Sequence, residues 1–178
     1  GGRDAFIGKL DSLFTADSKL EGESTSVDIS GLIGQYAHGN EPSHHIAHLY
    51  NYVGQPWRTQ EIVDEVLHTL YFNNPDGLSG NEDCGQMSAW YILNAMGFYQ
   101  VCPGKPVYSI GRPLFNEATV HLKDGKSFKV IAHNNSRDNK YVRSIVLNGN
   151  KLETPVFTHQ DIVDGGTLEL TMGSEPLK

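Results

Sequence analysis

The sequence predicts an α+β fold in which helices come first and an antiparallel sheet follows. In the first part of the chain, apolar residues recur every three or four positions, which is the period of an amphipathic helix. After Phe98 they alternate with polar residues, which is the period of a strand. We therefore expect a helical region at 1–99 and a β region at 100–178, a size that suits one or two small domains.

The first two expected helices are separated by a polar stretch. Between residues 3 and 14, one helical face carries the apolar side chains Phe6, Ile7, Leu10, Leu13 and Phe14. The polar stretch 15–30 then predicts a long loop. Pro42 suits the first turn of a second helix, which we expect to end at Gly54. Its apolar stripe is Ile46, Leu49, Tyr50 and Val53.

The third and fourth expected helices lie on either side of a loop at 73–81. Thr59 is the expected N-cap of the third helix, whose buried face is Ile62, Val63, Val66, Leu67 and Leu70. Asp83 or a neighbour is the expected cap of the fourth, which ends at Gly97 and buries Met87, Trp90, Tyr91 and Leu93. Short or capped connections predict that the four helices pair as hairpins.

The β region consists of four alternating segments. They are ATVHL at 118–122, SFKVIAH at 127–133, YVRSIVLNGNKL at 141–152 and TLELTM at 167–172. Asp124-Gly125 and Asn148-Gly149 are dipeptides typical of hairpin turns. These turns predict antiparallel pairing of the strands.

Composition excludes several classes of protein. The formal charge of −7 and the lack of a Lys/Arg cluster argue against nucleic acid or anionic lipid as a partner. No apolar run approaches the roughly 18 residues that a membrane span needs. Cys84 and Cys102 lack the spacing of a zinc site, and a disulfide between them is allowed but not implied. The chain shows no leader pattern at its start, which says nothing about secretion.

Two adjacent carboxylates, Glu82 and Asp83, stand at the start of the fourth expected helix. One interpretation is that Asp83 caps this helix while Glu82 is solvated. The other is that the pair does chemistry, as a general base, as metal ligands or as anchors for sugar hydroxyls. Glu41 stands at the start of the second expected helix, 42 residues before Asp83. Hairpin connections can bring these two helix starts to the same end of a bundle.

The donors near these carboxylates favour a hard cation over zinc. They are the oxygen-bearing side chains of Asn40, Glu41, Asn81, Glu82 and Asp83. His44 and His48 are spaced HxxxH, but without the glutamate of a metalloprotease. One interpretation of His44 and His45 is that one of them packs in the core and the other faces solvent. The other interpretation is that they line a binding site. Trp90 and Tyr91 read as core at helical spacing, whereas Trp57, after Pro56, is the better candidate for stacking on a ligand.

Three motifs together carry a resemblance to a known family. They are GNEPSHHIAHLYNYVGQPWRTQ at 39–60, GLSGNEDCGQMSAWYILNAMGFY at 77–99 and YSIGRPLF at 108–115. The chain resembles, over essentially its whole length, the C-terminal part of the family 92 glycoside hydrolases, calcium-dependent exo-α-mannosidases. The resemblance implies the last helical hairpins of an (α/α)6 toroid followed by an antiparallel β segment. It also implies an inverting reaction on an α-mannoside glycan.

The resemblance also implies roles for individual residues. Asp83 matches the catalytic base, with Glu82 as its acidic partner. Asn40 and Glu41 match the region that holds Ca²⁺, and His44 or His45 would line the sugar pocket, with Trp57 as a further candidate. The implied location is secreted, periplasmic or at the cell surface.

The sequence departs from the family pattern in one respect. The general acid of the family is a glutamate in a Trp- and Tyr-rich segment upstream of GNEP, and no such segment is present. We therefore expect this chain to be inactive alone, to need the N-terminal part of the same enzyme as its partner, and to be prone to self-association. Two alternatives stay open: a non-catalytic carbohydrate-binding or packing module, and a metal-dependent hydrolase of another substrate.

Overall fold

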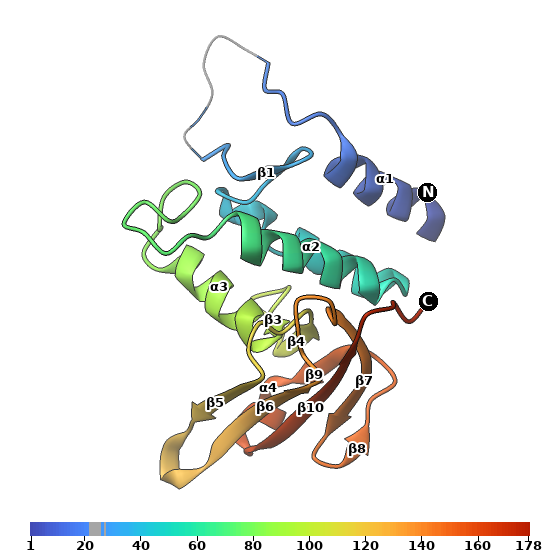
Figure 1. The fold of residues 1–178 in the computed structure, drawn as a ribbon, viewed down its shortest axis with the longest axis vertical. Coiled ribbons are helices and arrows are strands. Elements are labelled where there is room, and N and C mark those ends of the chain that lie inside the picture. The colour runs from blue at the N-terminus through green and yellow to red at the C-terminus, as the bar shows by residue number, and fades with distance from the viewer. Residues whose placement is uncertain (22–25, 27) are drawn as a thin grey trace.

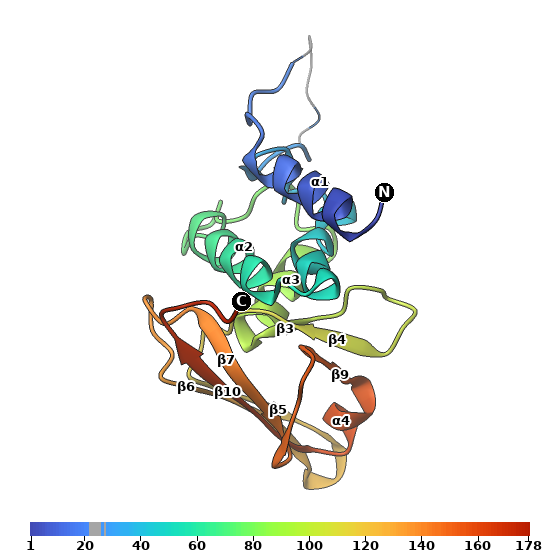
Figure 2. The same ribbon diagram turned by 90° about the vertical axis from the view of Figure 1, so that its right-hand side faces the viewer.

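The computed structural model describes residues 1–21, 26 and 28–178 as two stacked layers. Figures 1 and 2 show a helical layer built from the first half of the chain above a β layer built from the second half. This arrangement confirms the predicted α+β class. The predicted loop at 15–30 lies partly outside the described residues, and its first residue, Thr15, belongs to the preceding helix. None of the described helices combines the length and the apolar character needed to cross a membrane.

Within the described residues, the helical layer contains three α-helices and two 3₁₀ helices. They are α1 (Arg3–Thr15), η1 (Glu41–Ser43), η2 (Ile46–Val53), α2 (Pro56–Thr69) and α3 (Gln86–Met96). A short hairpin, β1 (Leu32–Ile33) with β2 (Tyr36–Ala37), precedes η1. η2 and α2 pack against each other on either side of Gly54, whose left-handed φ of 71° ends η2 as expected.

Two details of the predicted helices are wrong. The second helix is not an α-helix but the pair η1 and η2. Its buried residues Ala47 and Tyr50, and likewise His48 and Asn51, are spaced by three, which is the 3₁₀ period. Thr59 is not an N-cap either: α2 begins at Pro56, because a proline ring already holds the helical φ, and Thr59 is buried inside the helix.

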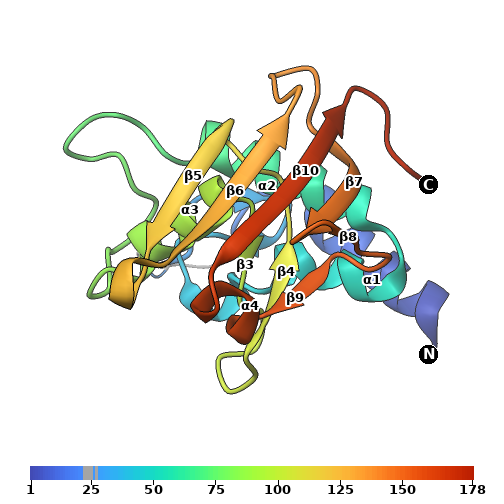
Figure 3. The ribbon, with the colours of Figure 1, turned by 90° about the horizontal axis from the view of Figure 1, so that it is seen from below.

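The β layer has a main sheet of five strands in the order β5-β6-β10-β7-β8. Figure 3 shows its long strands side by side across the helical layer. The strands are β5 (Glu117–His121), β6 (Ser127–His133), β7 (Tyr141–Leu147), β8 (Asn150–Lys151) and β10 (Gly166–Gly173). A short 3₁₀ turn, η3 (Lys123–Gly125), joins β5 to β6, and Asn148-Gly149 joins β7 to β8, so both predicted turns are confirmed.

One strand pair departs from the antiparallel prediction. β10 pairs antiparallel with β7 but parallel with β6, so the main sheet is mixed and its central strand carries the one parallel pairing described. The chain leaves β8, adds β9 (Val156–Thr158) to a second sheet, passes through α4 (His159–Val163) and then inserts β10 between β6 and β7. The second sheet, of order β3-β4-β9, also contains β3 (Phe98–Tyr99) and β4 (Val107–Ile110).

Each layer has its own hydrophobic core. One cluster is built around Val63, Val66, Tyr50 and Trp90, and the other around Phe128, Leu168 and Leu170. Polar contacts join the layers: Gln60 Oε1 accepts from the Val142 N–H at 3.1 Å, and Tyr141 Oη donates to Glu61 Oε1 at 2.8 Å. The two cores meet near residues 98 and 99, close to the boundary proposed between 1–99 and 100–178.

Candidate active site

Three loops converge beside the start of α3, and glycines let them approach. They run over residues 28–31, 37–41 and 79–83. A Cβ added to Gly39 would lie 2.2 Å from Ser30 Oγ, and one added to Gly80 would lie 2.8 Å from the Gly39 carbonyl oxygen. The Asn81 amide donates to Asp28 Oδ1 at 2.9 Å. Only a backbone without side chains fits this junction, which brings the loop bearing Glu41 against the loop bearing Asp83.

Glu41 and Asp83 meet at this junction, as the sequence predicted for the two helix starts. Contact with Glu41 raises the pKa of Asp83, first because the two carboxyl groups can share a proton, then through desolvation and the repulsion of two negative charges. The Oε1 atom of Glu41 is buried and has no hydrogen-bond partner among the described residues. The exposed Asp83 and the half-buried Glu41 therefore form a pair of like charges that no Lys, Arg or His side chain of the described residues neutralises.

Asp83 does not cap α3, contrary to the first interpretation of the acidic pair. The N-cap is Gly85, and three consecutive residues, Asp83, Cys84 and Gly85, have φ values of 47°, 57° and 95°. Left-handed backbone costs roughly 1–2 kcal/mol for a residue with a side chain. Such strain persists where the surrounding structure requires it, and it is common at functional sites.

Glu82 interacts with the first turn of α3 instead. Its carboxylate accepts from the Ser88 N–H at 3.1 Å and from Ser88 Oγ at 3.0 Å. Negative charge is favourable at a helix N-terminus, where free N–H groups point outward. Glu82 therefore caps α3 in place of Asp83. The Asp83 carboxyl contacts Glu41 instead.

His44, whose backbone N–H donates to the Glu41 carbonyl, is buried, whereas His45 is half-buried. His44 Nε2 donates to the His38 carbonyl at 2.9 Å, so its Nδ1 is an acceptor, and Gln86 Nε2 donates to that atom at 3.2 Å. Burial lowers the pKa of His44, which keeps the ring neutral. Both ring nitrogens are engaged inside the protein.

A second buried histidine, His38, supports the same region. Tyr36 Oη donates to His38 Nδ1 at 2.9 Å, His38 Nε2 donates to Tyr71 Oη at 2.7 Å, and Tyr71 Oη donates to the Met87 carbonyl at 3.1 Å. Burial lowers the pKa of His38 to about 3. Sequence reasoning missed His38, Tyr71 and Gln86, although His38 directly precedes the first quoted motif and Gln86 lies inside the second.

The structure does not bring Trp57 to this site. Trp57 is half-buried in the first turn of α2, whereas the Tyr71 that contacts His38 follows the last turn. A helix of 14 residues at 1.5 Å per residue separates the two ends by roughly 20 Å. Trp90 belongs to the core, and its Nε1 donates to the His44 carbonyl at 3.1 Å.

The described residues supply only part of a cation site. They contain no group of three or more His, Cys, Asp or Glu side chains arranged to hold a metal. Yet the buried oxygen of Glu41, the adjacent Asp83 carboxyl and the neighbouring Asn40 are hard donors that suit Ca²⁺. Calcium takes six to eight oxygens, so other donors would have to complete the shell.

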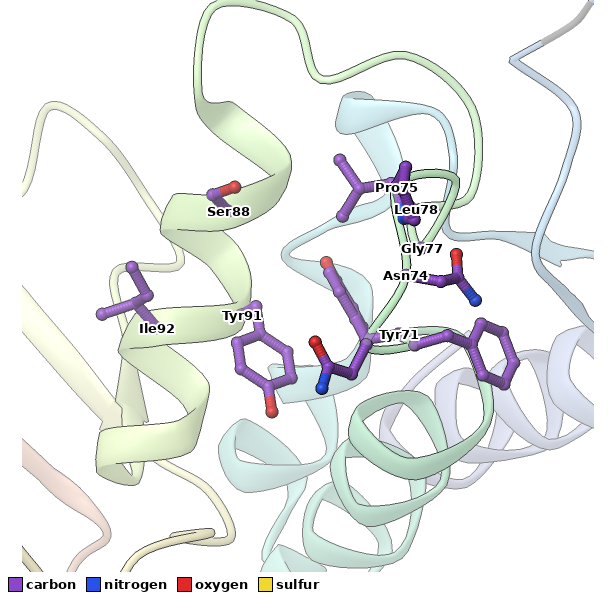
Figure 4. A pocket seen from close by; sticks show the side chains of 10 residues that line it. Tyr71, Asn74, Pro75, Gly77, Leu78, Ser88, Tyr91 and Ile92 are labelled. Carbon is purple, nitrogen blue, oxygen red and sulfur yellow. The ribbon is translucent and has the colours of Figure 1, made fainter.

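An open pocket of about 520 Å³ adjoins the acidic loop. Figure 4 shows Ser88, Tyr91 and Ile92 of α3 on one side and Tyr71, Asn74 and Leu78 on the other. Ser88, which lines the pocket, donates to Glu82, so one residue of the pocket wall contacts the neighbour of Asp83. Aromatic faces beside amide and hydroxyl groups suit a polyol such as a sugar. Cys84 and Cys102, which the sequence left open to pairing, are free and exposed.

Solved structures similar to this chain include a family GH92 alpha-mannosidase from Bacteroides thetaiotaomicron, with 44% identity and a TM-score of 0.89. The structure of the same enzyme in complex with mannoimidazole has a TM-score of 0.92. Each of these two matches covers 99% of this chain and 23% of the enzyme chain. A family GH92 inverting mannosidase from the same organism has 42% identity and a TM-score of 0.83. This match covers 99% of this chain and 25% of the mannosidase chain.

A curated relative and a family model agree with these structures. An uncharacterized secreted glycosidase from Arthroderma benhamiae is 30% identical over 178 residues, which are 98% of this chain and 21% of that protein. The chain thus spans a quarter or less of the length of these relatives. The model of the glycosyl hydrolase family 92 catalytic domain matches residues 1–174. The chain belongs to glycosyl hydrolase family 92.

Proposed function

We propose that this chain is the C-terminal part of an inverting exo-α-mannosidase and that Asp83 is its catalytic base. The observation that carries the proposal is the state of the Asp83 carboxyl. It is exposed on a left-handed backbone, caps no helix and lies against Glu41 rather than against a Lys or Arg side chain of the described residues. A carboxylate held this way has no structural use that offsets its cost, which favours a chemical role.

The chemistry that Asp83 would perform is proton abstraction from water. In an inverting glycosidase, a carboxylate activates water on the face of the sugar opposite the leaving group. The contact with Glu41 raises the pKa of Asp83, which makes the ionised group a stronger proton acceptor. Glu82, bound to Ser88, would support the loop on which this base sits.

Glu41 is too close to Asp83 to be the acid of the same reaction. The acid and base of an inverting enzyme stand roughly 6.5–9.5 Å apart, so that water fits between the base and the sugar. Carboxyls close enough to share a proton leave no such space. The general acid would therefore come from a part of the longer enzyme outside these 178 residues, and the chain alone would not hydrolyse mannosides.

Glu41 and Asn40 would hold Ca²⁺ together with donors from the rest of the enzyme. The buried, unpartnered oxygen of Glu41 supports this assignment. When bound, the ion would supply positive charge that holds neighbouring sugar hydroxyls. It would also offset the repulsion within the Glu41–Asp83 pair.

The sugar-binding assignments have unequal support. His45, half-buried and four residues after Glu41, stays a candidate for the pocket wall. His44 uses both ring nitrogens internally, and Trp57 lies at the far end of α2, so neither has a free group at the Glu41–Asp83 pair. A secreted, periplasmic or cell-surface location is supported by the name of the Arthroderma relative.

The rival function is a non-catalytic carbohydrate-binding module, which the aromatic pocket of Figure 4 favours.

The decisive experiment replaces Asp83 with Asn in the longer enzyme and assays an aryl α-mannoside with calcium present. Turnover should fall by about two to four orders of magnitude with folding unchanged, because Asn keeps the shape but accepts no proton.

Asp76→Asn is the matched control, since it changes an exposed carboxylate in the preceding loop and should leave turnover intact. Near-normal turnover of Asp83→Asn would contradict the base assignment and favour the binding module. Release of mannose by the 178-residue chain alone, if it depended on Asp83, would contradict the proposed external acid.

A further inference from the structure

The Glu41–Asp83 pair is repeated three residues further along each segment by a second pair, His44 and Gln86. Both pairs are 42 residues apart in the sequence. On each side, one backbone hydrogen bond links the acid to its follower: His44 N–H donates to the Glu41 carbonyl at 3.0 Å, and Gln86 N–H donates to the Asp83 carbonyl at 3.3 Å. Each carboxylate is therefore tied by a single turn to the side chain that follows it.

The two side chains then join the two segments. Gln86 Nε2 donates to His44 Nδ1 at 3.2 Å. Together with the contact between the carboxyl groups, this bond closes a ring of four residues: Glu41, His44, Gln86 and Asp83. The Glu41–Asp83 contact is repulsive when both acids are charged. The attractive His44–Gln86 hydrogen bond must therefore hold the two segments together.

Both members of the attractive side are anchored in the core. His44 is 1% exposed, its Nε2 donates to the His38 carbonyl at 2.9 Å, and its carbonyl accepts from Trp90 Nε1 at 3.1 Å. The Gln86 amide also donates to Tyr99 Oη at 3.3 Å. These contacts fix the side-chain orientations on which the His44–Gln86 bond depends.

We propose that His44 and Gln86 are positioning residues, whose mutual hydrogen bond sets the separation and direction of the Glu41 and Asp83 carboxyls. The inference rests on the proposed role of Asp83 as base. The described hydrogen bonds of the His44 and Gln86 side chains all go to other groups of the protein. Each acts through the carboxylate three residues before it.

Substitutions at the two positions separate positioning from packing. In the longer enzyme, Gln86→Met keeps the length of the side chain but removes its donor, and kcat should fall about 10- to 100-fold, the usual cost of losing a supporting hydrogen bond, with KM changed little. His44→Asn places an oxygen near the position of Nδ1 and keeps the bond to Gln86. His44→Gln instead places a donor near Nε2 and loses that bond.

The matched pair is the sharpest test. His44→Asn and His44→Gln should lower the melting temperature to a similar extent, since each keeps one of two buried hydrogen bonds. However, the kcat of His44→Asn should be at least several-fold higher than that of His44→Gln. Equal kcat values for the two variants, or an unchanged kcat in Gln86→Met, would overturn the inference.

A double substitution distinguishes this inference from the proposed function. If Gln86 acts through Asp83, adding Gln86→Met to Asp83→Asn should cause almost no further loss of kcat. A full additional loss would mean that Gln86 acts by another route and would overturn the positioning role. High activity of Asp83→Asn itself would instead overturn the proposed function.

Discussion

Asp64 and Asp83 are two aspartates in opposite surroundings. Asp64 lies in the middle of α2 with its side chain 9% exposed, and its Oδ1 lies 2.9 Å from Arg112 Nε and 3.2 Å from His68 Nδ1. Asp83 is exposed on left-handed backbone and faces another carboxylate. The first arrangement joins the helical layer to the β layer, whereas the second stabilises nothing that we can identify. The difference indicates which carboxylate serves the fold and which serves chemistry.

The surroundings of Asp64 also show what a structural carboxylate requires. Arg112 is 2% exposed, and its other nitrogens donate to the carbonyls of Pro113 and Ser136, so the buried charge is matched and hydrogen-bonded. The Arg112 Nε–Asp64 Oδ1 contact lacks hydrogen-bond geometry and is an electrostatic contact. Glu41 and Asp83 have no comparable counter-charge among the described residues.

The largest effect should come from breaking the buried ion pair. Arg112→Met leaves Asp64 buried with only His68 and the more distant Arg137, and should lower the free energy of unfolding by about 3–5 kcal/mol. Urea denaturation of the chain measures this. The control is Arg137→Met, which removes an exposed partner 3.6 Å from Asp64 and should cost less than about 1 kcal/mol. Equal losses in the two variants would refute the structural role of the buried pair.

A smaller effect should come from a buried, satisfied histidine. His48 is buried, Nε2 donates to Asn94 Oδ1 at 2.8 Å, and burial lowers its pKa to about 4, only partly offset by that bond. Between pH 6.5 and pH 4 the unfolded chain binds a proton that the folded chain does not, so stability falls as pH falls. On going from pH 8 to pH 5, His48 should account for a loss of roughly 2 kcal/mol.

His48→Gln keeps a donor near Nε2 and removes the titrating ring, so its stability should depend less on pH than that of the wild type. The exposed His121 offers the control, and His121→Gln should leave the pH dependence unchanged. Denaturation curves at pH 8 and pH 5 give the comparison. Identical pH dependence in His48→Gln and the wild type would show that His48 is not held neutral by burial.

The smallest effect on the fold should come from Glu41→Gln. This change removes one of two like charges, so the metal-free chain should be as stable as the wild type or slightly more stable. In the longer enzyme, calcium should raise the melting temperature of the wild type but much less that of Glu41→Gln, and chelation should abolish turnover. Activity that survives exhaustive chelation would remove calcium from the mechanism, and a clear loss of stability in the metal-free variant would make Glu41 a structural residue like Asp64.

The sequence by itself determined the features whose signal lies within a few neighbouring residues. The helical period over 3–14 predicts α1, and the apolar run ending at Gly97 predicts α3. The alternating segments predict the strands, and Asp-Gly and Asn-Gly predict their turns, since these residues tolerate positive φ. The sequence also predicted that Glu41 and Asp83 can lie at the same end of the helical region, whereas the contact of their carboxyls depends on the loops packed around Gly39 and Gly80.

Only the tertiary structure decided features that depend on distant parts of the chain. The parallel pairing of β10 with β6 depends on a crossover through the second sheet, and the 3₁₀ winding of η2 on burying residues spaced by three. The capping by Glu82 in place of Asp83, and the bond between His44 and Gln86, depend on how three loops pack around their glycines. The period of a sequence reports which side of an element is buried, and it carries no information on which distant group fills the space opposite. Because each such contact contributes a free energy comparable to a local preference, the assembled protein can override the local signal at these positions.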